Sequence, residues 1–424
     1  MFKVVLPLLC LAVTCSAQTF LCGAGKSAPG TTVLQASTIY SDKAAGFDLE
    51  ASPAVSPSGC SSESGFFFSV PLEEGNYRVT VVLGGSYAAV TTVRAEARRL
   101  MLFHVATAAG KTRTESFVVN VRRPEIAGSG GRVVKRKPRE LNSLNWDDKL
   151  TLEFAGTHPS VRSIRIQPAD PATPTVYLAG DSTVVDQDNE PWAAWGQMLP
   201  GFFGPELAIA NDAESGETIA SFEGEGRFAK IFSTLHRGDY LFIQFAHNDQ
   251  KPGKGYVSPE RYEDLLQKYT NLARSKGATP VLVTSMNRRT YDRGGHVTDT
   301  LAPYPQTMKK LADADHVSLI DLNAMSKILY EAVGEAKSKS LFVYADANTY
   351  PGQIQPLHDD THFDGYGAYE LARCVVLGIQ QAGLPLTRQL RQPSLRFNPA
   401  KPDSLQSVVL PVAPFFNLEK PYER

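Results

Sequence analysis

The chain has 424 residues, a length that suggests two or three domains. Hydrophobic residues make up 42% of it and charged residues 21%, the composition of an ordinary globular protein. The net charge of −1 gives no basis for a nucleic-acid partner or for binding to an anionic membrane surface.

Residues 1–17 are interpreted as a secretory signal peptide. Lys3 precedes a short apolar run, and small residues precede Gln18, so cleavage is expected after Ala17. The run is too short to span a bilayer, and no other apolar run is long enough. Cys15 as a lipid-modification site is disfavoured, because the residues before it fit such a site poorly. We therefore expect a secreted or periplasmic protein that is not bound to a membrane.

Three cysteines remain after that cleavage. Export permits a disulfide, and Cys22 with Cys60 is the natural pair because both lie in the same early segment. Cys374 has apolar, helical surroundings and is expected to be a buried thiol. Connectivity is not fixed by the sequence alone.

The segment 18–167 is predicted to be an N-terminal β-sandwich domain of the jelly-roll kind. Its short runs alternate between apolar and polar residues, as in 77–83, 149–154 and 161–166, and Gly-rich turns such as 128–131 separate them. Three prolines lie in "QPADPATPT" (167–175), so residues 168–175 are predicted to be a linker.

The segment 176–387 is predicted to be an α/β domain. Continuous apolar runs are typical of parallel strands buried on both faces, and they occur at 176–180, 207–211, 240–246, 280–286 and 317–322. Helical patterns lie between them. The clearest is 258–277, with Ser258 as the expected N-cap, Pro259 in the first turn and Gly277 at the end. The Pro-rich tail 388–424 is expected to wrap the surface.

Polar residues that could carry chemistry follow the predicted strands of this α/β domain. Ser182 comes directly after the first strand, and a hydroxyl becomes a good nucleophile only when a base takes its proton. His362 is the candidate base, and Asp359, three residues earlier, is favoured over Asp360 as the group that orients it. The alternative for Ser182 is a helix cap.

A developing oxyanion needs hydrogen-bond donors, and three are available from strand ends. They are the backbone N–H groups of Ser182 and Gly216 and the side-chain amide of Asn248. The alternatives are purely structural roles, in which Gly216 only permits a turn and Asn248 only stabilises one. The chain has no Gly-x-Ser-x-Gly sequence, which excludes the usual nucleophile elbow of α/β-hydrolases.

Taken together, the blocks "GDST" (180–183), "NDAESG" (211–216), "AHND" (246–249) and "DDTHF" (359–363) resemble the SGNH, or GDSL-like, hydrolases. Within these the chain is most similar to the rhamnogalacturonan acetylesterases, over roughly half its length. The resemblance implies a flavodoxin-like three-layer α/β/α fold, no metal or other cofactor, and removal of acetyl groups from pectic polysaccharide. It also implies that the β domain is like a module that some bacterial members carry.

The blocks depart from the family pattern at two places. Ala246 stands where the family usually has Gly, and Glu217-Thr218 stands where it usually has Arg-Ser. An acid near the site weakens the case for a polyanionic substrate, but neither change threatens the esterase chemistry. Another acetylated glycan such as xylan, a lipid or thioester substrate, and a non-catalytic carbohydrate-binding role remain alternatives.

Other residues have weaker functional interpretations. Trp192 and Trp195 could stack on a sugar ring, although core packing is favoured. Arg288, with its neighbour Arg289, could meet a uronate carboxylate, although a solvated pair is favoured. Metal binding through His358 and His362 is disfavoured because no third ligand stands out. The basic run 132–139 is expected to be a solvated loop, with contact to an acidic polysaccharide as the alternative.

Overall fold

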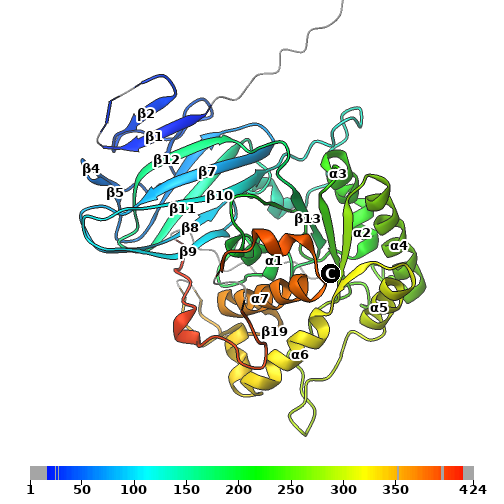
Figure 1. The fold of residues 1–424 in the computed structure, drawn as a ribbon. Helices are drawn as coiled ribbons and strands as arrows, with labels where there is room; N and C mark the ends of the chain where they lie inside the picture. The colour runs from blue at the N-terminus through cyan, green and yellow to red at the C-terminus, as the bar shows by residue number, and fades with distance from the viewer. Residues whose placement is uncertain (1–16, 24, 27, 351–352, 393–395, 414–424) are drawn as a thin grey trace, which may run out of the picture.

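The computed structural model describes residues 17–23, 25–26, 28–350, 353–392 and 396–413 (Figure 1). The expected signal peptide, except for Ala17, lies outside these residues. Antiparallel strands fill the first part of the chain, and a parallel sheet with helices fills the second (Figure 1). The change falls between Pro168 and Thr175, where the prolines predict a linker.

Two sheets build the N-terminal region, and all their pairs are antiparallel except that between β1 and β2. The first sheet has the order β10-β7-β12-β1-β2, with β4 and β5 at its side. Its strands are β1 (Gln18–Cys22), β2 (Thr31–Leu34), β4 (Ala54–Ser56), β5 (Gly59–Ser61), β7 (Gly75–Leu83), β10 (Arg113–Val121) and β12 (Ser160–Pro168). The second sheet has the order β3-β6-β11-β8-β9. Its strands are β3 (Gly46–Asp48), β6 (Phe66–Pro71), β8 (Ala89–Ala95), β9 (Arg99–Thr107) and β11 (Lys149–Thr157).

One hydrophobic core lies between these sheets, because alternating residues of both contribute to it. On β7 the alternation predicted from the sequence puts Val79, Val81 and Leu83 into this core. The disulfide between Cys22 and Cys60, with Cα atoms 5.3 Å apart, lies in the same core and confirms the predicted pair. The prediction of a β region is thus confirmed.

On β11 the predicted alternation of apolar and polar residues is present, but the polar face is buried as well. Thr151 and Glu153 are almost fully buried. Glu153 pairs with Arg94 of β8 at 2.9 Å, and Arg94 also bonds to Pro411 O of the C-terminal tail. A buried carboxylate needs such a partner, and the alternation of β11 could not reveal that the tail covers this face.

The second region has a five-stranded parallel sheet of order β14-β13-β15-β16-β17. Its strands are β13 (Thr175–Gly180), β14 (Ala208–Asn211), β15 (Tyr240–Gln244), β16 (Thr279–Val283) and β17 (Ser318–Ile320). All five match the predicted apolar runs. Numbered along the chain, the order is 2-1-3-4-5, which is that of flavodoxin-like doubly wound sheets, in which ligands bind outside the carboxyl ends of the strands.

Helices cover both faces of this sheet. Val176 and Leu178 of β13 pack with α1, α6 and α7, whereas Tyr177 and Ala179 pack with α2 to α5. The helices are α1 (Trp195–Met198), α2 (Ile219–Gly224), α3 (Arg227–Thr234), α4 (Pro259–Ser275), α5 (Tyr304–Ala314), α6 (Leu322–Val333) and α7 (Gly365–Gln381). Short 3₁₀ helices are η1 (Pro138–Asn142), η2 (Leu199–Phe202), η3 (Lys337–Leu341), η4 (Pro385–Gln389) and η6 (Leu405–Ser407). The three layers confirm the predicted α/β fold.

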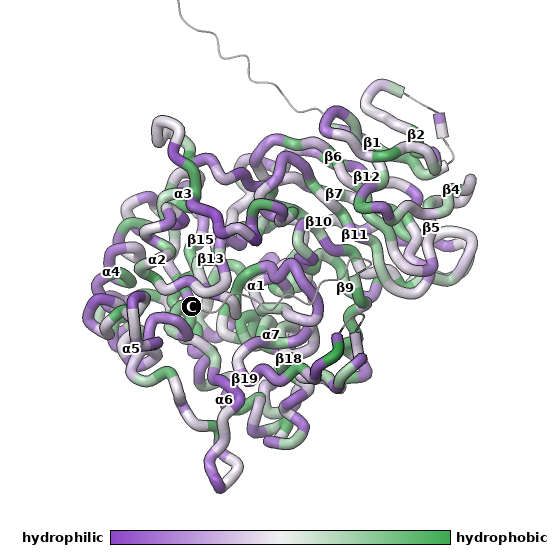
Figure 2. Tube along the Cα trace, turned by 180° about the vertical axis from the view of Figure 1, so that it is seen from behind, coloured by the Kyte–Doolittle hydropathy of each residue, from purple (hydrophilic) through white to green (hydrophobic). Residues whose placement is uncertain are grey.

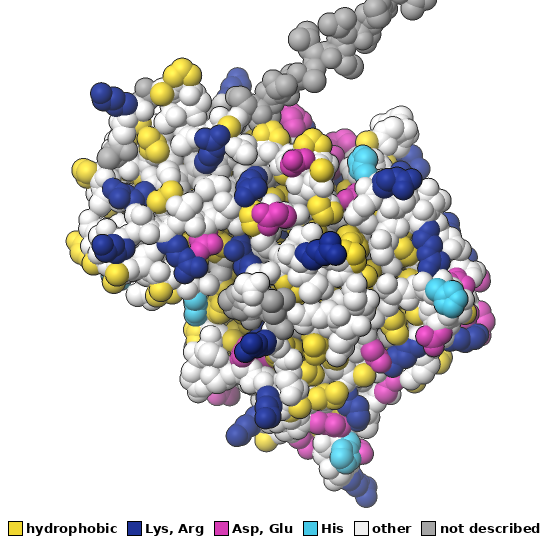
Figure 3. Space-filling model, viewed as in Figure 1, with side chains coloured by type: hydrophobic (Ala, Val, Ile, Leu, Met, Phe, Trp, Pro, Cys, Tyr) yellow, Lys and Arg dark blue, Asp and Glu magenta, His cyan; other side chains and the backbone are white. Residues whose placement is uncertain are grey.

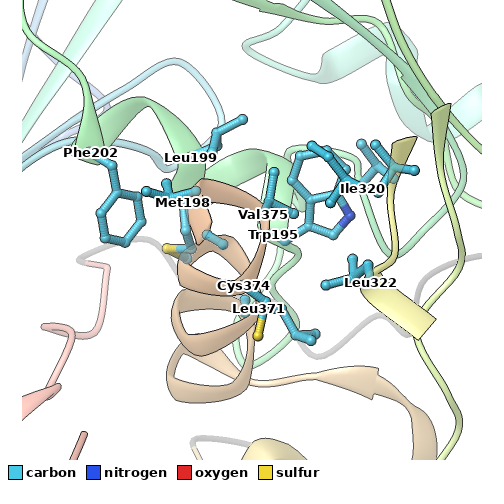
Figure 4. Packing of buried hydrophobic residues seen from close by; sticks show 14 of the residues in the cluster. Trp195, Met198, Leu199, Phe202, Ile320, Leu322, Leu371, Cys374 and Val375 are labelled. Carbon is cyan, nitrogen blue, oxygen red and sulfur yellow. The ribbon is translucent and has the colours of Figure 1, made fainter. Parts of the chain in front are cut away.

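The helix α4 illustrates how the local sequence sets its bounds. Ser258 Oγ accepts a hydrogen bond from the Arg261 N–H at 3.3 Å, and Pro259 occupies the first turn, as predicted. The chain leaves the helix through Gly277, whose φ of +77° is readily available to glycine. On the other face, Trp195 and Cys374 lie in the core between α1 and α7, so the predicted buried thiol is confirmed (Figure 4).

The two regions are joined by buried polar contacts. Arg99 of β9 pairs with Asp186, which follows β13, at 2.8 Å, and Asp186 also accepts from Asn211 Nδ2 at 2.7 Å. The described part of the tail bridges both regions as well: Tyr366 OH donates to Asp403 O at 2.7 Å, and His104 Nε2 lies 2.7 Å from Val409 O.

Hydrophobic stretches lie mostly on the central elements and hydrophilic ones on the peripheral loops (Figure 2). Charged side chains of both signs are interspersed over the face drawn in Figure 3. Within the described ranges, no helix is both long and apolar enough to cross a membrane.

Candidate active site

Ser182 lies in a tight turn directly after β13. Asp181 Oδ1 accepts from the N–H and the hydroxyl of Thr183 at 2.9 and 2.7 Å, and Val184 N donates back to Asp181 O at 3.0 Å. A Cβ at Gly180 would lie 2.5 Å from Val184 Cγ2, so the turn requires glycine there. The next helix, α1, has Ala194 as its N-cap, which removes the helix-cap interpretation of Ser182.

Ser182, His362 and Asp359 form one hydrogen-bonded series. His362 Nε2 is 2.9 Å from Ser182 Oγ, and His362 Nδ1 is 2.9 Å from Asp359 Oδ2. The second oxygen of Asp359 accepts from the backbone N–H groups of Thr361 and His362 at 2.9 and 3.0 Å. All three side chains that form the series are buried. This carboxylate–imidazole–hydroxyl series can activate a serine as a nucleophile.

The charge of Asp359 is stabilised by the same contacts. Burial acts to raise the pKa of Asp359. Its hydrogen bond and electrostatic attraction to His362, together with the bonds from two backbone N–H groups, outweigh this effect. The pKa of Asp359 therefore lies well below its ordinary value, and the carboxylate stays ionised while it orients the ring.

Asp360 lies elsewhere. It is exposed, accepts from Tyr344 OH at 2.6 Å and pairs with Arg289 at 3.2 Å. Asp359 and Asp360 both belong to β19 (Leu357–Phe363), which pairs with β18 (Phe342–Ala345). The polar composition of residues 358–363 favours a loop, whereas the structure has a β-strand there, in a hairpin with β18. Neighbouring side chains of a strand point to opposite sides, which separates Asp359 from Asp360.

The candidate oxyanion donors come from two neighbouring loops. Gly216 follows β14 and has a φ of +76°. Asn248 follows β15, is buried, and donates from Nδ2 to Glu217 O at 3.0 Å, so it lies against the Gly216 loop. An amide carries two N–H donors and this bond uses one. Glu214 N donates to Gly180 O at 3.1 Å, which ties the same loop to the nucleophile strand.

Sequence reasoning missed two residues that support Ser182. Gln187 Nε2 donates to Ser182 O at 2.7 Å and so fixes the backbone of the turn. His247 lies 3.6 Å from Asp181 of the same turn, and both side chains are buried. Burial lowers the pKa of His247, with Asp181 acting in the opposite direction. The only sequence signal for His247 was its place in "AHND" beside Asn248.

The structure excludes sugar stacking at the two candidate tryptophans and leaves the role of Arg288 open. Trp192 and Trp195 are 2% and 1% exposed, so neither offers a ring face to a sugar, and the stacking hypothesis is wrong for both. Trp195 instead donates from Nε1 to Gln244 at 2.8 Å. Arg288 donates to His247 O of the "AHND" block at 3.1 Å. A contact between Arg288 and a substrate stays a prediction.

The hypothesis of a metal at His358 and His362 finds no support. Both ring nitrogens of His362 already have protein partners, and His358 stacks against Tyr344 on the surface. Within the described residues, no group of three or more His, Cys, Asp and Glu residues is placed to hold a metal ion.

Two expectations about charge are wrong. Glu217 is fully buried, so it does not face a substrate and gives no argument against an acidic one. The basic run 132–139 is not simply a solvated loop, because Lys137 pairs with Glu217 and Arg139 with Glu214. A single sequence could not show this, since the charges lie about 75 residues apart in the chain.

Residues 178–364 match the GDSL-like lipase/acylhydrolase family model, a range that includes every residue of the hydrogen-bonded series. The chain is 44% identical over 217 residues to the rhamnogalacturonan acetylesterase RhgT of Bacillus subtilis, covering 51% of this chain and 93% of that protein. It is 35% identical to the probable rhamnogalacturonan acetylesterase YesY of the same organism, covering 51% and 96%. The uncharacterized esterase YxiM, also of B. subtilis, is 26% identical, and this match covers 85% and 90%.

Proposed function

The chain belongs to the GDSL-like lipase/acylhydrolase family, and on that premise we propose that it is a carboxylic ester hydrolase that removes O-acetyl groups from plant cell-wall polysaccharide. The hydrogen-bonded series of Ser182, His362 and Asp359 is the observation that carries this proposal. Acetylated rhamnogalacturonan is the proposed substrate class, supported by the names of two relatives above 30% identity.

In the proposed mechanism Ser182 Oγ attacks the acetyl carbonyl while His362 Nε2 takes its proton. The oxyanion of the tetrahedral intermediate is held by the N–H groups of Ser182 and Gly216 and by the amide of Asn248. His362 then protonates the departing sugar hydroxyl, and an acetyl-enzyme remains. Water, deprotonated by His362, releases acetate and restores the serine. Asp359 keeps Nδ1 protonated and stabilises the imidazolium throughout.

A hollow beside β19 carries charges of both signs, because Glu335 lines it and Asp360 pairs with Arg289 at 3.2 Å. Arg289, Lys339, Tyr344 and His358 line a hollow of about 500 Å³, together with Glu335. Arg289 and Lys339 lie over the Tyr344 ring at 5.5 and 5.3 Å, so cations and a flat aromatic surface occur together. The guanidinium of Arg289 is already bonded to Asp360 and to Glu335 O, so this hollow gives no preference for a sugar ring that bears a carboxylate. The burial of Glu217 removes the earlier objection to such a substrate.

Export to the periplasm or the exterior is proposed with the enzyme. The Cys22–Cys60 disulfide supports an oxidising compartment, where such bonds persist. The jelly-roll form of the N-terminal sandwich is likewise a proposal, supported by the core that its two sheets share.

Acetate release from a panel of substrates tests the function. Wild-type protein and Ser182→Ala are compared on acetylated rhamnogalacturonan, acetylated xylan and a long-chain acyl ester. The proposal expects the fastest release from rhamnogalacturonan and none by the variant. Faster release from xylan would point to a different glycan, and preference for the long-chain ester would point to a lipase.

A further inference from the structure

The loop that carries Gly216 is held from outside by a segment of the N-terminal region. Lys137 Nζ donates to Ser215 O and pairs with the carboxylate of Glu217, and these two residues flank Gly216. Arg139 Nε donates to Glu214 Oε1 at 2.9 Å. Two cations of the β region thus bind this loop on both sides of the glycine.

The segment that supplies these cations is itself anchored. Glu140 Oε2 accepts from Lys137 N at 2.7 Å and pairs with Arg227 of α3 at 2.6 Å. Its other oxygen accepts from Trp146 Nε1 at 3.1 Å. Lys135 N donates to Glu225 O at 2.9 Å, so the segment after β10 runs beside α3 (Figure 1). The backbone that carries the two cations is therefore fixed against α3.

The loop that carries Gly216 is also bonded to the "AHND" block (246–249). Asn248 Nδ2 donates to Glu217 O at 3.0 Å, and Ile219 N donates to Asp249 Oδ1 at 2.9 Å. Lys137 faces the side chain of Glu217, whereas Asn248 holds its carbonyl. The buried carboxylate of Glu217 needs this cation, because an uncompensated buried charge is strongly destabilising and would move the loop.

We propose that Lys137 and Arg139 are positioning residues of the active site, which hold the Gly216 N–H where the oxyanion forms. The N-terminal region thereby takes part in catalysis performed by the other region. This inference rests on the proposed esterase function, because only a forming oxyanion makes the loop position matter. Oxyanion donors act through pre-organisation, and losing one costs about 10²–10³ in kcat.

The test compares Lys137→Met with Lys230→Met. Lys230 is a matched control: it also crosses between the regions, pairs with Glu74, and donates to Glu125 O at 2.7 Å, but it does not bond to the Gly216 loop. With a small acetate ester, we expect Lys137→Met to lower kcat by about tenfold to a hundredfold with KM within about twofold. Lys230→Met should leave kcat within about twofold, and Lys137→Arg should restore most of the loss.

Hydrogen exchange of the backbone amides of residues 213–219 gives a second readout that needs no ester hydrolysis. Exchange should speed up in Lys137→Met and stay unchanged in Lys230→Met. Unchanged kcat and exchange in Lys137→Met, or equal losses in both variants, would overturn the proposal. Absence of esterase activity in the wild type would refute the proposed function, and exchange in Lys137→Met would then still show whether Lys137 holds the loop in place. If Lys137→Met does not fold, Arg139→Gln carries the same expectation on a smaller scale.

Discussion

Replacing Asp359 by Asn should abolish most activity while leaving the fold in place. Asn retains Oδ1, which can still accept from the N–H groups of Thr361 and His362. An amide NH₂ would replace Oδ2 and donate to His362 Nδ1, so the proton of the neutral ring moves to Nε2. Nε2 then cannot accept the proton of Ser182. The corresponding change in a serine protease costs about 10⁴ in kcat, or about 5 kcal/mol of transition-state stabilisation.

Asp360→Asn is the matched control, because it changes the neighbouring carboxylate on the opposite side of β19. Its contacts are Tyr344 and Arg289 on the surface, so kcat for a small acetate ester should stay within about twofold. Both variants are measured at several pH values, with thermal unfolding as a check on folding. Wild-type kcat in Asp359→Asn, or an equal loss in Asp360→Asn, would refute the assignment of the orienting group.

Three further substitutions probe the supporting structure. Burial raises the pKa of Asp249 to about 8, so the free energy of unfolding of the wild type falls as pH rises from about 4 to 8. In urea unfolding, Asp249→Asn should reduce this pH dependence by up to about 1.4 kcal/mol per pH unit, and parallel pH profiles of the two proteins would contradict this. Replacing Cys22 and Cys60 by Ala opens a 38-residue loop and should cost about 4 kcal/mol of unfolding free energy without changing kcat; a drop in kcat of the folded protein would count against a purely structural role. Gly180→Ala places a methyl 2.5 Å from Val184 Cγ2 and should cost about 1–3 kcal/mol and at least about tenfold in kcat; a variant equal to wild type in both would disprove the close approach.

Much of the second region follows from the sequence because its signals are local. Five apolar runs gave five parallel strands, and Ser258, Pro259 and Gly277 marked the bounds of α4. Contacts between distant segments left no such signal. Buried Glu153 bonds to Arg94 of a neighbouring strand, and Arg94 bonds to Pro411 O of the distant tail. The alternation of one strand reports its own period and not what packs on its second face.

The candidate site divides in the same way. Ser182, Asp359 and His362 could be proposed from residue type and order alone, and the structure brings their side chains together. Residues that act through another residue could not be found, because Gln187 and Lys137 belong to no motif. Their roles depend on a backbone carbonyl that only the fold places beside them.

The proposed mechanism requires Ser182 as the nucleophile, which covalent trapping of the acetyl-enzyme can test. The protein is mixed with an activated acetate ester, quenched within the first turnovers, digested and examined by mass spectrometry. We expect an acetyl group on the peptide that contains Ser182, with no label and no turnover in Ser182→Ala. Steady turnover by Ser182→Ala, or acetylation of another residue in the wild type at the rate of turnover, would contradict it.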